Sequence, residues 1–73
     1  MEVDMVHGGD LIKVARTARG MTQDELASLS GFGRRTLQRW ESKRAEPGFS
    51  AVFMICDQIC GVEVPQAMKL LEA

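Results

Sequence analysis

Apolar residues recur every three or four positions along most of the chain, and glycine or proline stands at the breaks between the periodic stretches. This spacing places the apolar side chains on one face of a helix, and it predicts helices over about 10–19, 23–29, 34–41, 50–60 and from 65 onward. No segment shows the alternation of apolar and polar residues that a half-buried strand requires. We therefore expect an all-α domain of five short helices.

The N-terminal residues differ from the rest of the chain. Residues 1–9 have no periodic apolar face and end in two glycines, so we expect a flexible lead-in in which His7 has no specific role. The folded domain is expected over 10–73, with Asp10 as the cap of the first helix. Gly20 follows that helix at a position where a left-handed residue is common.

Residues 22–41 predict two short helices joined by a tight turn. Thr22 and Glu25 have the spacing of a capping box, which starts the first of these helices at Gln23. Gly31 supplies the positive φ angle of the turn. The small or apolar side chains expected to fill the angle between the two helices are Leu26, Ala27, Phe32, Leu37 and Trp40.

The C-terminal part predicts two more helices. Ser50 is expected to start the fourth helix, with Phe49 stapling its beginning to the core. Gly61 ends that helix, and Pro65 suits the first turn of the fifth. The apolar side is expected to consist of Val52, Phe53, Cys56, Ile59 and Cys60 in the fourth helix, and of Met68 and Leu71 near Ala67 in the fifth.

The cysteines and the single histidine do not suggest a reactive site. Cys56 and Cys60 are one helical turn apart, which suits neither a zinc site nor a disulfide, so we expect small buried hydrophobic residues. No nucleophile–base pair, metal-ligand set or phosphate loop is visible, so we expect no enzyme activity, cofactor or metal. The longest apolar run, 51–56, is too short to cross a membrane, and we see no secretory signal, so we expect a cytoplasmic protein.

Charge is distributed unevenly along the chain, although the formal net charge is only −1. Residues 13–44 carry eight basic and three acidic residues, whereas the segments on either side are acidic. A basic middle segment indicates a partner with regularly spaced negative charge, and duplex DNA is such a partner.

The two-helix element carries a recognisable family pattern. That pattern consists of Gln23, Leu26-Ala27, Gly31, Phe32 and Trp40-Glu41, together with Pro47-Gly48-Phe49. Over residues 11–62 it resembles the Cro/CI-type repressors, also called the XRE family. The resemblance implies a compact, lambda-repressor-like domain of five helices in which the second and third form the helix-turn-helix. It also implies a buried ion pair between Arg16 and Glu41.

The resemblance further implies that the third helix lies in the major groove of double-stranded DNA. The residues implied to contact DNA are Gln23, Arg34, Arg35, Thr36, Gln38, Arg39, Lys43 and Arg44. Among them Arg34 and Arg35 occupy the first base-reading positions, where an arginine pairs with guanine O6 and N7. Ser30 and Gly33 depart from the family pattern. Ser30 is expected to rotate or loosen the end of the second helix, and Gly33 leaves the third helix without a side-chain cap.

These expectations favour a sequence-specific transcriptional regulator that acts as a repressor. We expect it to be prokaryotic or phage-encoded and to be associated with the nucleoid when it is bound to DNA. We expect a homodimer, held by the C-terminal helix, on an inverted-repeat operator. The alternative is a protein-interaction module of the same fold, such as an antitoxin whose main partner is a separate protein. In 73 residues we expect no ligand-sensing domain, so control would come from protein concentration, proteolysis or a partner protein.

Overall fold

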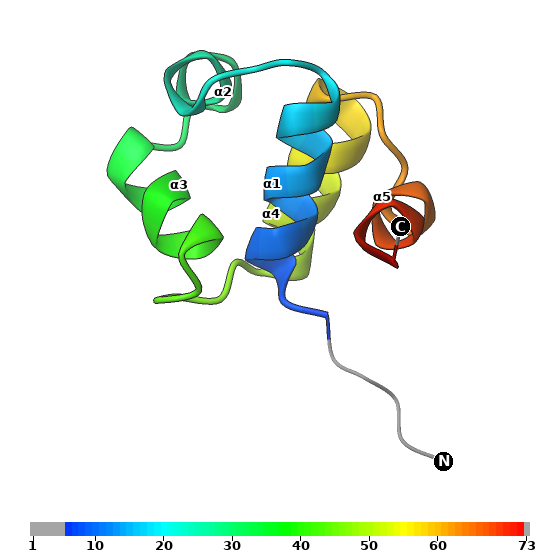
Figure 1. Cartoon of the computed structure of the whole chain (residues 1–73). Helices are drawn as coiled ribbons and strands as arrows, with labels where there is room; N and C mark the ends of the chain where they lie inside the picture. The colour runs from blue at the N-terminus through cyan, green and yellow to red at the C-terminus, as the bar shows by residue number, and fades with distance from the viewer. Residues whose placement is uncertain (1–5, 73) are drawn as a thin grey trace.

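The computed structural model describes residues 6–72 as helices and connecting loops (Figure 1). The helices are α1 (Gly8–Ala18), α2 (Gln23–Ser30), α3 (Arg34–Glu41), α4 (Phe49–Phe53), η1 (Met54–Ile59) and α5 (Val64–Glu72). The π-helix η1 continues α4 without a break, so the two form the fourth helix of the chain. The described residues contain no strand, and the all-α fold with five helices is confirmed. None of these helices is long and apolar enough to cross a bilayer.

Helix α1 lies at the centre of the fold (Figure 1). Helices α2 and α3 lie on one side of it and α5 lies on the other. Because α1 contacts α3, α4, η1 and α5, its apolar face provides the surface on which the other helices pack. The side chains buried in this core are Leu11, Ile12, Ala15, Leu26, Leu37, Val52, Ile55, Cys56, Cys60, Val62 and Ala67.

Helix α1 begins two residues earlier than the sequence predicted, and a histidine caps it. His7 Nδ1 accepts a hydrogen bond from the Gly9 backbone N–H at 3.0 Å, and His7 Nε2 lies 2.9 Å from Glu46 Oε2. The predictions that Asp10 caps the helix and that His7 has no role were therefore wrong. Of the predicted lead-in, residues 1–5 lie outside the described residues, whereas both glycines are helical.

The two glycines at the start of α1 are required by close packing and not by flexibility. A Cβ atom at Gly9 would overlap the backbone carbonyl of Trp40 near the end of α3. A Cβ atom at Gly8 would lie 2.7 Å from Pro47 Cγ and 2.8 Å from Val52 Cγ2. Such an approach between distant segments is not visible in the local sequence, where a glycine pair is typical of a flexible segment.

The other helix boundaries lie within one residue of the predicted ones. Thr22 and Glu25 form both hydrogen bonds of the capping box, at 3.1 and 2.9 Å. Gly20, Gly31 and Gly61 have φ angles of 68°, 81° and 68°. Residues with a Cβ atom rarely adopt these angles, so glycine allows the chain to turn where α1, α2 and η1 end.

The fourth helix begins at Phe49 instead of Ser50, and Val52, Cys56 and Cys60 of its predicted apolar side are buried. Phe49 is 74% exposed, so it does not staple the helix to the core as predicted. It stacks instead on Phe53, which is 40% exposed, with the ring centroids 6.3 Å apart. Ile55, which was absent from the predicted apolar face, is fully buried. Ile55 lies three residues after Val52, so it belongs to the same buried helix face and was an omission from the predicted set.

Cys56 and Cys60 are free and buried, as the sequence predicted. Burial raises the pKa of the Cys56 thiol to about 11, and it also raises the pKa of Cys60. The Cys56 thiol lies 3.5 Å from the carbonyl oxygen of Leu11 in α1. Both thiols are therefore neutral at pH 7 and pack as small apolar side chains.

Replacing Gly9 by alanine is expected to destabilise the protein, because the added Cβ atom forces α1 and α3 apart at Trp40. We expect a loss of at least about 2 kcal/mol in the free energy of unfolding, measured by urea denaturation. Gly48→Ala is the matched control, since no heavy atom lies within 4 Å of the added Cβ atom. Its effect should stay below about 1 kcal/mol. Equal losses in the two variants would contradict the close packing at Gly9.

Candidate nucleic-acid interface

Helices α2 and α3 form the predicted helix-turn-helix element. Leu26 of α2 and Leu37 of α3 are both fully buried. Phe32 in the turn packs edge-on against Trp40, with ring centroids 5.0 Å apart and planes at 70°. These contacts fix the direction of α3 relative to α2.

The turn between α2 and α3 is stabilised by a serine side chain. Ser30 was expected to loosen the end of α2, but α2 continues through Ser30, and its Oγ accepts a hydrogen bond from the Phe32 N–H at 3.2 Å. The preceding apolar residue, Leu29, is 62% exposed. The serine hydroxyl therefore stabilises the turn through a hydrogen bond. Gly33 gives α3 no side-chain cap, as predicted.

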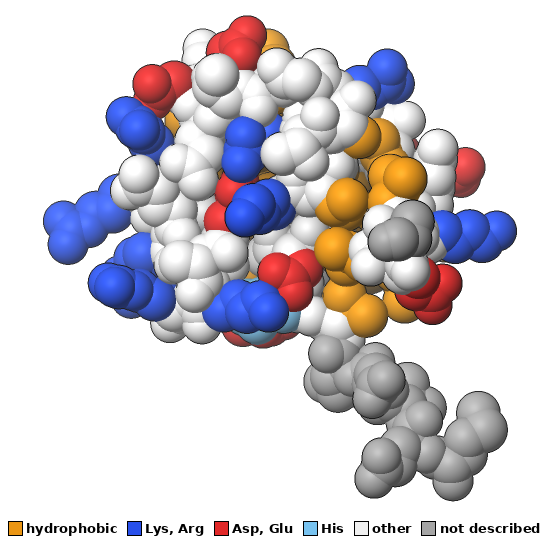
Figure 2. Space-filling model, in the orientation of Figure 1, with side chains coloured by type: hydrophobic (Ala, Val, Ile, Leu, Met, Phe, Trp, Pro, Cys, Tyr) orange, Lys and Arg blue, Asp and Glu red, His pale blue; other side chains and the backbone are white. Residues whose placement is uncertain are grey.

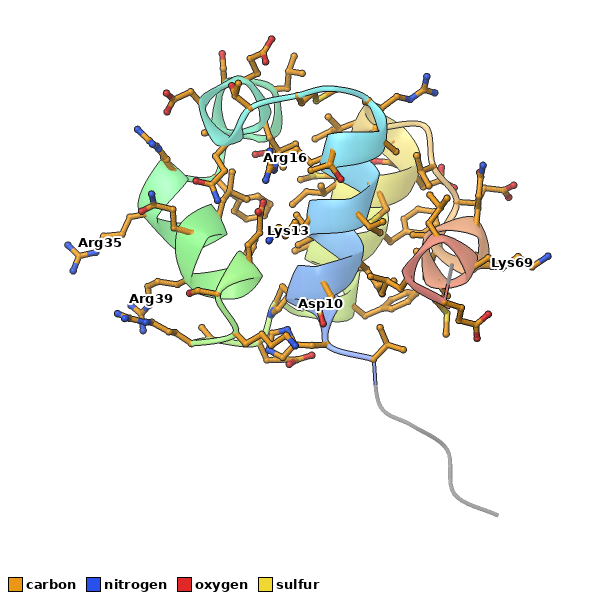
Figure 3. All side chains as sticks on the ribbon, in the orientation of Figure 1. Asp10, Lys13, Arg16, Arg35, Arg39 and Lys69 are labelled. Atoms are coloured by element: carbon orange, nitrogen blue, oxygen red, sulfur yellow. The ribbon has the colours of Figure 1, made fainter. Side chains whose placement is uncertain are left out.

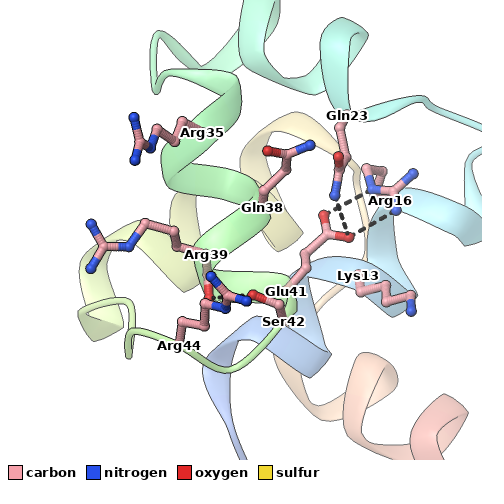
Figure 4. A pocket seen from close by; sticks show the side chains of 9 residues that line it. All are labelled: Lys13, Arg16, Gln23, Arg35, Gln38, Arg39, Glu41, Ser42 and Arg44. Atoms are coloured by element: carbon pink, nitrogen blue, oxygen red, sulfur yellow. Dashed lines mark hydrogen bonds and ion pairs between the residues drawn. The ribbon is translucent and has the colours of Figure 1, made fainter.

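Arg16 of α1 and Glu41 of α3 form a buried ion pair (Figure 4). Arg16 Nε lies 2.9 Å from Glu41 Oε2 and Arg16 Nη2 lies 2.8 Å from Oε1, and the two side chains are 13% and 5% exposed. The hydrogen bond to Glu41 raises the pKa of Arg16. Gln23 Nε2 at the start of α2 also donates to Glu41 Oε1, at 3.3 Å. One buried carboxylate therefore links α1, α2 and α3.

A groove of about 730 Å³ opens between α1, α2, α3 and the loop that follows α3 (Figure 4). The side chains that line it are Lys13, Arg16, Gln23, Arg35, Gln38, Arg39, Glu41, Ser42 and Arg44. Five of the nine are cations at neutral pH, and the one carboxylate among them is paired with Arg16. The groove is therefore a concave surface of positive charge.

The structure places five of the eight residues predicted to contact DNA along this groove. They are Gln23, Arg35, Gln38, Arg39 and Arg44. Arg35 and Arg39, one turn apart on α3, extend away from the body of the protein (Figure 3). The loop after α3 turns sharply at Lys43, which has a φ angle of 66°, and the Arg44 N–H donates to the Arg39 carbonyl at 2.9 Å. This turn returns Arg44 to the groove.

The other three predicted residues lie beside the groove. Arg34 Nε is 3.3 Å from Asp24 Oδ1, and Lys43 Nζ is 3.2 Å from Asp10 Oδ2. Thr36 is exposed and lines a separate recess of about 210 Å³. The contacts of all eight residues with DNA stay predictions. Among the predicted cations, Arg34 and Lys43 pair with carboxylates, whereas Arg35, Arg39 and Arg44 line the groove.

Sequence reasoning missed Lys13 as a site residue. It lies three residues before Arg16 on α1, and both side chains line the groove. The signal was present, because Lys13 begins the basic segment 13–44 and residues three apart share a helix face. The family pattern does not point to Lys13, since its residues lie mainly on α2 and α3.

Cationic and apolar side chains gather on different sides of the molecule (Figure 2). Lys and Arg side chains cover the side of α3, whereas hydrophobic side chains are exposed around α5. In α5 only Ala67 is buried, and Met68, Leu70 and Leu71 are 42%, 40% and 39% exposed. The face around α5 is therefore an apolar surface, separate from the positively charged groove.

Comparison with known proteins gives matches over most of the chain. Residues 12–59 match the model of a family described as helix-turn-helix. Relatives from Methanosarcina mazei and Methanosarcina acetivorans are each 35% identical over 65 residues, which is 89% of this chain and 20% of the relative. Both are named "Putative HTH-type transcriptional regulatory protein". The chain thus spans about a fifth of the length of these relatives. No solved structure gives a significant match.

Replacing Glu41 by glutamine is expected to destabilise the fold, because Arg16 would remain buried beside a neutral group. We expect a loss of about 3 kcal/mol in the free energy of unfolding, measured by urea denaturation. Arg16→Met combined with Glu41→Leu should recover part of this loss, since no buried charge is then left unpaired.

The control for this prediction is Glu25→Gln, which removes the same charge from an exposed position and leaves a residue that completes a capping box. Its effect should be below about 1 kcal/mol. If Glu41→Gln were no less stable than Glu25→Gln, the buried ion pair would not be a structural link between α1 and α3.

Proposed function

The chain belongs to the helix-turn-helix family, and from this membership we propose that it is a transcriptional regulator that binds double-stranded DNA through α3. The observation that carries the proposal is the positively charged groove beside α3, with Arg35 and Arg39 extending from that helix (Figures 3 and 4). The regulatory role is supported by the names of the Methanosarcina relatives. We propose that the regulator is a repressor, because a protein that occupies a promoter blocks access without further machinery.

In the proposed complex, the first turns of α3 lie in the major groove. Arg35 pairs with guanine O6 and N7, and Gln38 contacts an adjacent base, since both side chains are on the outer face of α3. Arg39, one turn after Arg35, binds a base or a phosphate. Thr36 reaches a phosphate or a thymine methyl group from the flank of α3.

Phosphate contacts in this proposal come from the rim of the groove. Gln23 stands at the start of α2, where backbone N–H groups attract an anion. Lys13 and Arg44 approach the same surface from α1 and from the loop after α3. Contacts of this kind set the orientation of the protein on the duplex, and base contacts set its sequence preference.

Replacing Arg35 by alanine is expected to weaken binding to the preferred duplex by about 1–3 kcal/mol and to relax base preference at one position. Arg44→Ala should instead weaken binding to all duplexes about equally, because phosphates are the same in every sequence. The measurement is titration of duplexes that wild-type protein selects from a random pool, at several salt concentrations. Binding should weaken steeply as salt rises.

The same titration at low salt can contradict DNA binding. If the wild-type protein retained no duplex even at low salt, the proposed function would be wrong. The protein-interaction module of the same fold would then be the better interpretation.

We further propose a homodimer that binds an inverted repeat, with the apolar surface around α5 as the dimer contact. Met68→Glu combined with Leu71→Glu should convert the dimer to a monomer, because the contact would bury unpaired charges. Sedimentation equilibrium measures the change. Leu29→Glu is the control, since Leu29 is 62% exposed but lies on α2. A wild-type protein that stays monomeric at high concentration and on the selected duplex would exclude the dimer.

A further inference from the structure

An ion pair joins the beginnings of α2 and α3. Asp24 lies in the first turn of α2, and Arg34 is the first residue of α3. Arg34 Nε is 3.3 Å from Asp24 Oδ1, and the two side chains are 56% and 70% exposed. The neighbouring acid, Glu25, serves the capping box instead, with its carboxylate on the Thr22 N–H. Of the two adjacent carboxylates in α2, Asp24 therefore pairs with Arg34 and Glu25 caps the helix.

We propose that Asp24 is a positioning residue that directs Arg34 toward a guanine base, an inference that rests on the proposed DNA-binding function. The contact recorded between Asp24 and the guanidinium group is at Nε, and among residues 6–72 neither terminal Nη group of Arg34 donates a hydrogen bond, so both can meet another acceptor. Two parallel N–H donors match the O6 and N7 acceptors of guanine in the major groove. In this proposal Asp24 contacts Nε of Arg34, and the two Nη groups of Arg34 contact the base.

The benefit of this arrangement is reduced freedom of the Arg34 side chain. A long exposed arginine samples many rotamers, and it loses that freedom when it binds a single base. A carboxylate that already restrains Nε removes part of this loss before DNA arrives. An ion pair this exposed adds little to the stability of the fold, so its effect on binding can be separated from folding.

Asp24 should also lower the affinity of the protein for duplexes of unrelated sequence. Asp24 stands next to the surface proposed to face phosphates, and its negative charge repels every duplex equally. It therefore lowers affinity for unrelated sequences while it raises discrimination at one base pair. Arg35 and Arg39 have no carboxylate within 4.0 Å among residues 6–72, so base preference at the Arg35 position should not depend on Asp24.

The experiment compares Asp24→Asn with Glu25→Gln in the full chain. Both variants lose one negative charge from the same turn of α2, but only the first loses the partner of Arg34. The probes are the duplex selected by wild-type protein, its single-base variants and an unrelated duplex. Both variants should bind the unrelated duplex somewhat more tightly than wild type does. Asp24→Asn alone should lose discrimination by about 5-fold, at one base pair only.

Three results would overturn the inference. The first is equal discrimination in Asp24→Asn and Glu25→Gln. The second is an Asp24→Asn change that lowers discrimination as much in an Arg34→Lys background as it does in the wild-type background, because the effect would then not pass through Arg34. The third is a wild-type protein that binds no duplex at low salt. That result would overturn the proposed DNA-binding function as well, whereas the first two results would leave it standing. Thermal unfolding of each variant should match wild type within a few degrees.

Discussion

The position of α3 depends on the need to pair a buried charge. Glu41 is almost completely removed from water at the end of α3, and an ionised carboxylate is stable there only beside a cation. Arg16 meets that need from α1 with two hydrogen bonds, and Gln23 adds one from α2. Alternative directions of α3 would leave this charge unpaired. The ion pair thus selects one arrangement of the three helices that form the positively charged groove.

This buried pair also determines the charge of the groove. Because Glu41 is neutralised by Arg16, the remaining cations at the groove are not cancelled by the carboxylate beneath them. The apolar core makes the pairing possible, since α1 contacts α3 on one side and α5 on the other. A domain this small therefore separates a positively charged face from an apolar face by the width of one central helix (Figures 1 and 2).

The sequence predicted the features that depend on neighbouring residues. The capping box of Thr22 and the left-handed Gly31 were found because their signals are local. The start of α1 and the exposure of Phe49 were not found, because they depend on where distant segments meet. In the site, the family pattern supplied the residues of α3. The pairing of Arg34 with Asp24 was missed, since it requires the actual angle between α2 and α3.

Two cations beside the groove, Arg34 and Lys43, are paired with carboxylates. Their charges are therefore partly offset in the free protein. Lys43 holds Asp10, so in the free protein its charge is partly screened. The Lys43 side chain is 58% exposed and Asp10 is 29% exposed, and ion pairs open to solvent contribute about 1 kcal/mol or less. A phosphate in the proposed complex would compete for Lys43 at little cost, because counterion release favours the phosphate contact. In the free protein Asp10 therefore offsets the charge of Lys43. In the proposed complex that charge would be available to a DNA phosphate.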